Sequence, residues 1–454
     1  IFSFFLFVFF QNFTKKMRPN ILFFLPDQHR ADWLGINENL PLRTPNLNEL
    51  CSNGIFFVNA FTPSPLCAPA RACLATGLNY QKCKVPNNSY NMPLDIPTYY
   101  QVLRSTGYYV YGVGKFDLHK KDLYWNIDGS HLLSEWGFSG GIDNEGKLDA
   151  TSSYKQTGKP QGPYMAYLHK IGFANKYVDE HNKRHIHKDA YITELPEEAY
   201  CDNWVAENGL NFLRNFPKDK PWHLVVNFTG PHNPMDVTHK MHQNWQDINF
   251  PYPIANEQKD YSPEDHQRNR RYYAAMIENI DRHIGRYMNL LQERNEIDNT
   301  LIVFSSDHGE MLGDHNLWGK SVPFHPSIRI PMILAGPSIP KNKKKNALVS
   351  LHDLTATFLD YAGIDKLLPE SDSLSLRKVI EGKTEIHRNH IVSGLNNWIC
   401  VFDGRYKLIL QKKNSPVLYD LSKDPNELNN IAIQYPELVK KLQNYISTNN
   451  NDNP

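Results

Sequence analysis

Five short apolar segments, separated by helical patterns, constrain the fold of this chain more than any other feature. They lie at 20–25, 108–113, 222–228, 300–305 and 331–335. A strand that is buried on both faces has this continuous apolar character. Segments with a helical pattern lie at 97–106, 202–215, 265–293 and 353–362. Because strands spaced by helices are typical of α/β proteins, we predict a large, mostly parallel sheet flanked by helices.

The pattern changes near residue 385, where shorter strand patterns with tight turns begin. These strands are predicted at 398–402, 406–410 and 417–419. A helical pattern at 436–447 follows, and the chain ends in a polar tail at 449–454 that we expect to be disordered. We therefore predict a large α/β domain over 17–385 and a small C-terminal subdomain over 386–454, in which a helix accompanies an antiparallel sheet.

Several polar segments are predicted to lie outside the core. The segments 126–163 and 232–265 are too long for simple connections, so we expect them to shape the entrance of a binding site. The lysine-rich run 341–345 is predicted to be a solvated loop. Three histidines of a charged stretch are also predicted to be solvated loop residues rather than ligands, namely His181, His185 and His187.

The N-terminal segment 1–16 is open to two interpretations. Its first part, Ile1 to Phe10, is apolar but shorter than the about 20 residues of a membrane-spanning helix, so we expect no stable membrane insertion. It is either the end of a truncated signal peptide or a wrongly assigned leader before Met17. The first interpretation implies a secreted, periplasmic or lumenal protein, and the second a cytoplasmic one.

The overall composition excludes some classes of protein. The chain has 49 lysine and arginine residues against 48 acidic residues, so no strong field favours binding to nucleic acid. Six cysteines in 454 residues do not make a disulfide scaffold, although Cys73 and Cys83 could form one bridge.

Acidic side chains follow two of the predicted strands, at the point where each strand ends. Asp27 and Gln28 come after the first strand, and Asp307 and His308 come after the fourth. Ligands bind beyond the carboxyl ends of strands in open α/β sheets, and oxygen ligands favour a hard cation such as calcium or magnesium. Each aspartate alone could instead cap the turn or helix that follows it. Together they predict a divalent-metal site.

The segment from Pro65 to Gly77, PLCAPARACLATG, carries the most specific pattern in the chain. Cys67 lies two residues before a proline and four before Arg71, and a leucine and a Thr-Gly pair follow. A lone cysteine is usually a small buried side chain, but the whole pattern resembles the signature of the sulfatase family, C-x-P-x-R followed by x-x-L-x-T-G. In that family a dedicated enzyme converts the cysteine to formylglycine.

The resemblance extends from about residue 18 to about residue 432 and implies a catalytic domain with the alkaline phosphatase-like fold. It implies that one divalent cation, Ca²⁺ or alternatively Mg²⁺, is bound by five residues, which are Asp27, Gln28, Asp307, His308 and the converted Cys67. Arg71 and Lys115 would hold the hydrated aldehyde. His232 and Lys320 would contact the sulfate and protonate the leaving alcohol. Without the resemblance, His232 would be interpreted as a loop residue and the two lysines as surface residues.

The chain departs from the commonest family pattern in three places. Gln28 stands where many members have an acid, and His308 where many have an asparagine. Asp117 stands where a histidine usually acts on the diol. Either Asp117 takes that proton as a carboxylate base, or His119 acts from two residues further along. We favour His119 as a base or a substrate-site residue.

The resemblance implies an enzyme that hydrolyses sulfate monoesters of a sugar or another alcohol. One hydroxyl of the hydrated aldehyde attacks sulfur, and the second lets the covalent adduct collapse and regenerates the aldehyde. The expected partners are a sulfated small molecule or glycan and a formylglycine-generating enzyme. Two alternatives stay open: a phosphonate or phosphodiester hydrolase of the same superfamily, and a catalytically silent homologue that binds an anion or glycan.

Overall fold

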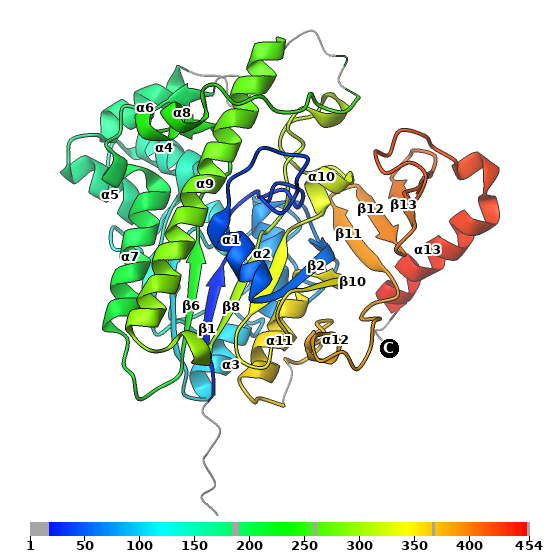
Figure 1. Ribbon diagram of the computed structural model, residues 1–454, viewed down its shortest axis with the longest axis horizontal. Helices are drawn as coiled ribbons and strands as arrows, with labels where there is room; N and C mark the ends of the chain where they lie inside the picture. The colour runs from blue at the N-terminus through cyan, green and yellow to red at the C-terminus, as the bar shows by residue number, and fades with distance from the viewer. Residues whose placement is uncertain (1–17, 184–189, 256, 258–260, 366–367, 452–454) are drawn as a thin grey trace, which may run out of the picture.

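An eight-stranded sheet forms the centre of the protein, in the order β10-β2-β9-β8-β1-β6-β3-β4 (Figure 1). The computed structural model describes residues 18–183, 190–255, 257, 261–365 and 368–451. The strands are β1 (Asn20–Phe24), β2 (Gly54–Phe61), β3 (Tyr109–Gly114), β4 (Gly140–Asp143), β6 (Trp222–Asn227), β8 (Thr300–Ser305), β9 (Met332–Ala335) and β10 (Lys343–Ser350). β9 runs antiparallel to its neighbours β8 and β2, and the other neighbouring strands are parallel.

The apolar run predicted as the first strand lies in the middle of this sheet. β1 pairs in parallel with β8 and β6 on its two sides, and all of its residues are buried. Successive side chains of a strand point to opposite faces, so Ile21 and Phe23 pack on one face and Leu22 and Phe24 on the other. A strand covered on both faces needs apolar side chains at each position, which explains the continuous run.

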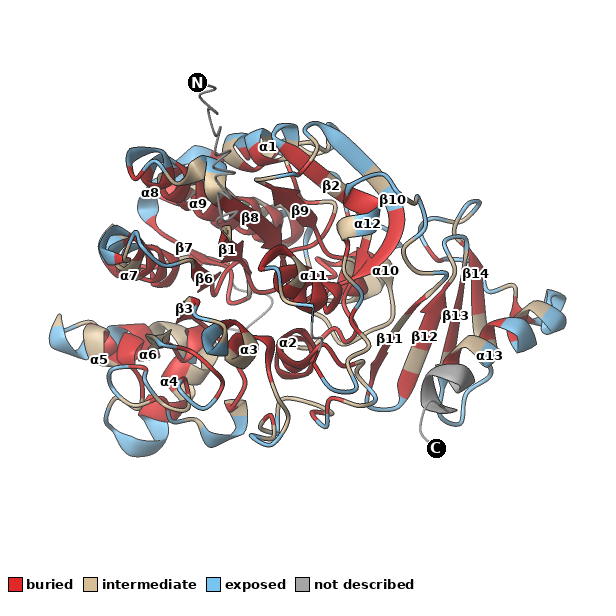
Figure 2. Ribbon diagram, turned by 90° about the horizontal axis from the view of Figure 1, so that it is seen from below, coloured by how far each residue is buried: buried red, intermediate tan, exposed pale blue. Residues whose placement is uncertain are grey.

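Helices cover both faces of the sheet, and Figure 2 shows that their buried sides face it. One face packs against α1 (Pro45–Ser52), α7 (Cys201–Asn215) and α9 (Pro263–Glu293). The other face packs against α2 (Cys67–Thr76), α3 (Tyr99–Ser105) and α11 (Asp353–Tyr361).

Shorter elements lie around this core. The helices are α4 (Gly146–Thr157), α5 (Pro163–Lys170), α6 (Ala174–Asn182), α8 (His239–Trp245), α10 (His325–Ile328) and α12 (Arg377–Ile380). The 3₁₀ turns are η1 (Lys120–Asp122), η2 (Glu197–Ala199), η3 (Ile297–Asn299), η4 (Asp314–Asn316) and η5 (Ala432–Gln434). A small parallel sheet consists of β5 (Tyr191–Ile192) and β7 (Asp236–Val237). Within the described ranges, no helix is both long and apolar enough to cross a membrane.

A second sheet, with a helix on its far side, forms the C-terminal part of the chain (Figure 1). Its antiparallel strands are β11 (Ile391–Leu395), β12 (Trp398–Phe402), β13 (Tyr406–Gln411) and β14 (Val417–Asp420). One face packs against Phe61, Ile328 and Leu348 of the large domain. The other face packs against α13 (Pro436–Asn451). Because both faces are covered, the short strands contribute apolar side chains to two separate clusters.

The predicted fold class is confirmed: a large, mostly parallel sheet is flanked by helices, and a small antiparallel sheet with a helix follows. The predicted strands correspond to β1, β3, β6, β8, β9, β12, β13 and β14, and the predicted helices to α3, α7, α9, α11 and α13. The sequence patterns missed β2, β4, β5, β7, β10 and β11. The long segments 126–163 and 232–265 contain regular elements of their own, including α4 and α8.

Some sequence-based predictions are wrong in detail. Lys343 to Lys345 begin the edge strand β10 and do not form a loop, because their backbone pairs with β2. Most of their side chains are exposed to solvent. His181 lies on α6, where its Nδ1 donates to the carbonyl of Tyr177 at 2.8 Å. The helix α13 extends to Asn451, beyond the predicted start of the tail.

One suggested disulfide is not formed, and several other predictions fall on residues outside the described ranges. Cys73 and Cys83 are both free thiols, so the suggested bridge is absent between these two described residues. The N-terminal segment 1–16 lies outside the described residues. So do His185, His187 and the end of the tail, 452–454.

We expect the stability of the fold to decrease below about pH 6.5, because it contains buried neutral histidines. Burial lowers the pKa of His223 to about 4, and burial together with Arg388 lowers that of His352 to about 4. The unfolded chain therefore binds protons that the folded chain does not bind. As the pH falls, each histidine lowers the free energy of unfolding by up to about 1.4 kcal/mol per pH unit. Urea unfolding at about pH 7 and about pH 5 measures this slope.

The variant His223→Gln should show a shallower pH slope than the unmodified protein, whatever its stability at neutral pH. His169 is exposed, so His169→Gln is the matched control and should leave the slope unchanged. Equal slopes for all three proteins would contradict the assignment.

Candidate active site

The carboxyl ends of three neighbouring strands lie together at one edge of the sheet, and polar residues follow them there. Asp27 follows β1, and its backbone N–H donates to the carbonyls of Phe228 and Gly230, both at 3.1 Å, in the segment after β6. Asp307 follows β8, and its Oδ1 accepts the N–H of Gln28 at 3.0 Å. Since β8, β1 and β6 are parallel neighbours, their carboxyl ends bring these residues together, as the strand order predicts.

The helix α2 begins at the same edge and places Cys67 at its first position. Leu66 before it is extended, and Pro69 is tolerated because the first turn of a helix needs no intrahelical N–H donors. The helix ends at Gly77, whose positive φ of 73° favours glycine. Cys67 is 1% exposed and lies at the electropositive end of the helix.

Four buried side chains form a group that could bind one metal ion. Asp27, Cys67, Asp307 and His308 each offer a ligand atom, and these atoms lie within 4.8 Å of one another. The Sγ of Cys67 lies 3.8 Å from Oδ1 of Asp27 and 3.4 Å from Nε2 of His308.

Three cationic side chains surround this group. The Nε of Arg71 donates to Oδ2 of Asp307 at 3.0 Å, one turn after Cys67 on α2. Lys115 forms an ion pair with Asp27, and its Nζ lies 3.6 Å from the Sγ of Cys67. The Nζ of Lys320 lies 3.2 Å from the same Sγ. The site therefore concentrates positive charge around Cys67.

A glycine fixes the position of Lys115. Gly114 ends β3 with a φ of 105°, and a Cβ there would lie 1.9 Å from the backbone oxygen of Asn227 in the neighbouring strand β6. Only glycine permits this approach, which allows the N–H of Lys115 to donate to the same oxygen at 3.1 Å. The lysine therefore leaves the sheet in a fixed direction, towards Asp27.

The surrounding charges perturb the ionisation of the site. Burial and Asp27 act to raise the pKa of the Cys67 thiol, but Lys115, Lys320 and His308 outweigh them and lower it to about 6. Burial would raise the pKa of Asp27, but Lys115 and Lys320 hold it well below its ordinary value. The site thus stabilises an anionic group at the position of Cys67.

The residues at this edge fit a divalent cation. Two carboxylates, from Asp27 and Asp307, are completely buried and face one another across the group. The side-chain oxygen of Gln28 also points into the site, where it accepts a hydrogen bond from Lys320 at 2.6 Å. Such an oxygen-rich set with one imidazole suits a hard cation.

A pocket of about 380 Å³ opens above Cys67. Most of the residues that line it have polar side chains, and they include the predicted residues Cys67, Lys115, His232 and Lys320. The lining residues that the sequence analysis did not select are Asn88, Lys120, Glu145, Lys147, Leu148, Asp149, Thr229, Asn233, Trp318, Gly319 and Ser321. The segments 126–163 and 232–265, expected to shape an entrance, both contribute to this wall.

Comparison with known families agrees with this geometry. A family model described as Sulfatase matches residues 19–364. The chain belongs to the sulfatase family. A second model, N-sulphoglucosamine sulphohydrolase, C-terminal, matches residues 313–452 of this sulfatase. Relatives named as an arylsulfatase, a choline-sulfatase and an N-acetylglucosamine-6-O-sulfatase agree with this, and the protein is a sulfatase enzyme.

Individual relatives resemble this sulfatase over nearly its full length. An arylsulfatase of Clostridium perfringens is 27% identical and covers 94% of this chain and 93% of its own. The solved phosphonate monoester hydrolase of Agrobacterium radiobacter is 23% identical, with a TM-score of 0.79 and 95% of both chains covered. A structure in complex with its substrate D-glucosamine-2-N,6-O-disulfate is 20% identical, with a TM-score of 0.76, and covers 96% of this chain and 99% of its own.

The two residues proposed to act on the diol lie in different surroundings in this sulfatase. The carboxylate of Asp117 lies between Lys115 and Lys120, with contacts of 3.1 and 3.0 Å. His119 donates from Nε2 to Oδ2 of Asp143 at 2.9 Å. Neither residue lines the pocket above Cys67. Asp143 holds the ring of His119 and two lysines hold the carboxylate of Asp117, so the assignment of either residue as the one that acts on the diol stays a prediction.

Lys120, in contrast to Asp117 and His119, lines the pocket above Cys67. Its Nζ donates to Asp117 and also to Asp149 of α4, and its side chain is 11% exposed. Burial would lower the pKa of Lys120, but the two carboxylates raise it, so the lysine stays charged.

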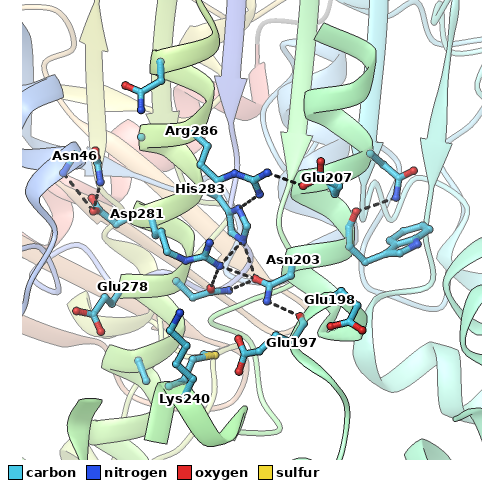
Figure 3. Close-up of a pocket in the computed structure, with 18 of the residues that line it drawn as sticks. Asn46, Glu197, Glu198, Asn203, Glu207, Lys240, Glu278, Asp281, His283 and Arg286 are labelled. Atoms are coloured by element: carbon cyan, nitrogen blue, oxygen red, sulfur yellow. Dashed lines mark hydrogen bonds and ion pairs between the residues drawn. The ribbon is translucent and has the colours of Figure 1, made fainter. Parts of the chain in front are cut away.

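A larger cavity, of about 1170 Å³, lies between α1, α7, α8 and α9 (Figure 3). Its polar side chains pair with one another: Nε2 of His283 contacts Asn203 at 2.7 Å, and Arg286 donates to Glu207 at 2.6 Å. Burial together with Arg282 and Arg286 lowers the pKa of His283 to about 2. These contacts connect α7 to α9, so we assign the cavity no chemistry.

Proposed function

We propose that this sulfatase hydrolyses a sulfate monoester of a sugar or another alcohol, with formylglycine derived from Cys67 as its nucleophile. The observation that carries this proposal is the position of Cys67: it begins α2 within a buried group of acidic ligands and lies below a polar pocket. A formylglycine-generating enzyme would act on the chain before folding encloses this buried residue.

We propose Asp27, Gln28, Asp307 and His308 as the protein ligands of one divalent cation, with Ca²⁺ favoured over Mg²⁺. The cation would supply Lewis-acid activation and charge neutralisation. The hydrated aldehyde would supply one hydroxyl for attack on sulfur and a second for release of the adduct.

The residues of the chain would stabilise the charge that moves during this reaction. Arg71 and Lys115 are held by Asp27 and Asp307, so they would be preorganised beside the nucleophile. Lys320 would contact the sulfate from the opposite side. The Nδ1–H of His232 donates to the carbonyl of Asn233 at 2.5 Å, which leaves Nε2 directed away from that bond. Because the proton of the neutral ring lies on Nδ1, Nε2 can deliver a proton to the leaving alcohol only from the imidazolium form. We propose that His232 acts in that form when the anionic sulfate is bound, with Lys320 beside it as the other proton donor.

We propose that Lys120 takes over part of the role that the histidine at position 117 has in other members. It carries a positive charge into the pocket, and Asp117 and Asp149 orient it. Lys147 would position His232, because its Nζ donates to the His232 carbonyl at 3.2 Å and forms an ion pair with Asp236 at 2.6 Å.

A sugar is the substrate class that the pocket wall favours. Asn88, Glu145 and Asp149 add hydrogen-bonding groups between the cations, and a sugar presents hydroxyls that such groups recognise. The similar structure described above was solved with an amino-sugar sulfate as its substrate.

Two measurements test the proposal. Peptide mass spectrometry of the segment from Pro65 to Gly77, after coexpression with a formylglycine-generating enzyme, should show Cys67 converted to the lighter aldehyde. A panel of matched aryl sulfate, phosphate diester and phosphonate substrates should show the highest kcat/KM for the sulfate. Turnover of a sulfate by material with an unmodified thiol would contradict the mechanism.

A phosphonate or phosphate-ester hydrolase is the second candidate. It is favoured by the likeness to the phosphonate monoester hydrolase of Agrobacterium radiobacter, and sulfuryl and phosphoryl groups are similar tetrahedral anions. The same panel separates the two, since this alternative expects the phosphonate to be the best substrate.

Lys120→Met should lower kcat/KM for an aryl sulfate by about 10²-fold, because one charged group that faces the substrate is lost. The adjacent Lys121 is exposed and does not line the pocket. Lys121→Met is therefore the matched control and should keep full activity. Steady-state kinetics on both variants measure the effect, and equal kinetics would show that Lys120 only supports the wall.

A further inference from the structure

A second group of metal-ligating side chains lies on the segment that follows β3. His119, Asp122 and His131 each offer a ligand atom, and these atoms lie within 4.8 Å of one another. These three residues do not line the pocket above Cys67. The proposed reaction therefore leaves them without a role.

His119 is arranged as metal-binding histidines usually are. It is 1% exposed, and its Nε2–H donates to Asp143, which is itself held by the N–H of Phe116 at 3.1 Å. The other ring nitrogen, Nδ1, is buried and has no hydrogen-bond partner among the described residues. Buried polar atoms rarely lack partners, and a metal-bound histidine commonly donates its second nitrogen to a carboxylate. The lone pair of Nδ1 is thus left available.

The surroundings of His119 fix its ring while the other two side chains can adjust. The ring stacks on that of Trp136, with centroids 5.3 Å apart and planes at 18°. The ring of His131 is half-buried and lies edge-on, with centroids 5.0 Å apart. Asp122 is exposed, and its Oδ1 accepts a hydrogen bond from Asn91 at 2.7 Å. An ion that enters from solvent would therefore meet one buried ligand, His119, whose ring is held by its neighbours, and two ligands that are exposed or half-buried.

We propose that His119, Asp122 and His131 bind a transition-metal ion of the zinc type, at a site separate from the cation at Asp27. Two imidazoles and one carboxylate suit Zn²⁺, whereas Ca²⁺ requires more oxygen ligands. Ligand atoms on one zinc ion lie at most about 4.2 Å apart, twice a bond of about 2.1 Å. Small rotations of the exposed Asp122 and the half-buried His131 would bring the group within this limit.

The position of the site suggests what the ion would do. His119 immediately precedes η1 and Asp122 ends it, so the ion would bind both ends of this short turn. Lys120, which lines the catalytic pocket, lies between them. The ion would hold η1, and with it Lys120, against the pocket wall. This consequence for activity rests on the proposed function, but the binding of the ion does not.

Titration of the calcium-saturated protein with Zn²⁺ by calorimetry, and with Co²⁺ by visible absorption, tests the site in the absence of substrate. The unmodified protein should bind about one zinc ion per chain that calcium does not displace. His131→Ala and Asp122→Asn should weaken this binding at least about tenfold. Both altered side chains reach solvent, so the fold should tolerate the changes, and unchanged circular dichroism would confirm this.

Two control variants separate this site from other sources of zinc binding. His169→Ala removes an exposed histidine elsewhere and should leave the affinity unchanged. Asp307→Asn alters the other cluster and should also keep the zinc ion. The proposal is overturned if no zinc binds beside calcium, or if Asp307→Asn abolishes the binding while His131→Ala does not. Neither result would bear on sulfate hydrolysis, which the substrate panel tests separately.

Discussion

Cys67→Ala should reduce kcat/KM for an aryl sulfate on the order of 10⁵-fold or more, because the substitution removes the proposed nucleophile and leaves only the binding contribution of the site. The fold should persist, since Cys67 forms no disulfide and alanine suits the first turn of α2. Steady-state kinetics measure the loss, and thermal unfolding checks that the protein is folded. Retention of most activity would rule out Cys67 as the nucleophile.

A matched control separates the chemistry of this residue from its packing. Cys73 is also buried on α2, but it faces the apolar core and does not line the pocket. Cys73→Ala should lower stability modestly while kcat/KM stays close to that of the unmodified enzyme. Cys67→Ser adds a mechanistic test: serine can attack sulfur but cannot release the adduct by elimination, so at most one turnover is expected.

Asp307→Asn should lower kcat/KM by at least about 10³-fold, because it removes one negative charge from the ligands of the proposed cation. Chelation of divalent ions should suppress the unmodified enzyme as well, and added Ca²⁺ should restore it. Asp32 also follows β1, five residues after Asp27, but it pairs with Arg30 at 2.6 Å and does not belong to the ligand group. Asp32→Asn is therefore the control. Full activity after complete metal removal would contradict the site.

Asp27→Asn should differ from Asp307→Asn in its effect on folding. Asp27 is completely buried and faces Arg71, Lys115 and Lys320. Loss of its charge removes a counter-ion that these three cations share, and breaking a buried ion pair typically costs about 3–5 kcal/mol. The free energy of unfolding, measured in urea without added metal, should therefore decrease more for Asp27→Asn.

The sequence by itself determined the fold class and most of the site. The run at β1 is apolar at successive positions because both faces of that strand are covered, and this signal is local. The pattern around Cys67 is also local, since Cys67, the proposed nucleophile, and Arg71 lie one turn apart on α2. Asp27 and Asp307 were found because each follows a recognisable strand. The pocket brings together Cys67, Lys115, His232 and Lys320, as the resemblance implied.

The tertiary structure alone decided the strand order and the departures from the family pattern. β9 is antiparallel, and β10 is a strand despite its lysines, because edge pairing with β2 satisfies its backbone. His119 and Asp117 are two residues apart, yet Asp143 holds one and two lysines hold the other. Lys120 lines the pocket because its ammonium group forms an ion pair with Asp149, which belongs to the separate helix α4. Such charge pairings join residues distant in the chain, so no local pattern specifies them.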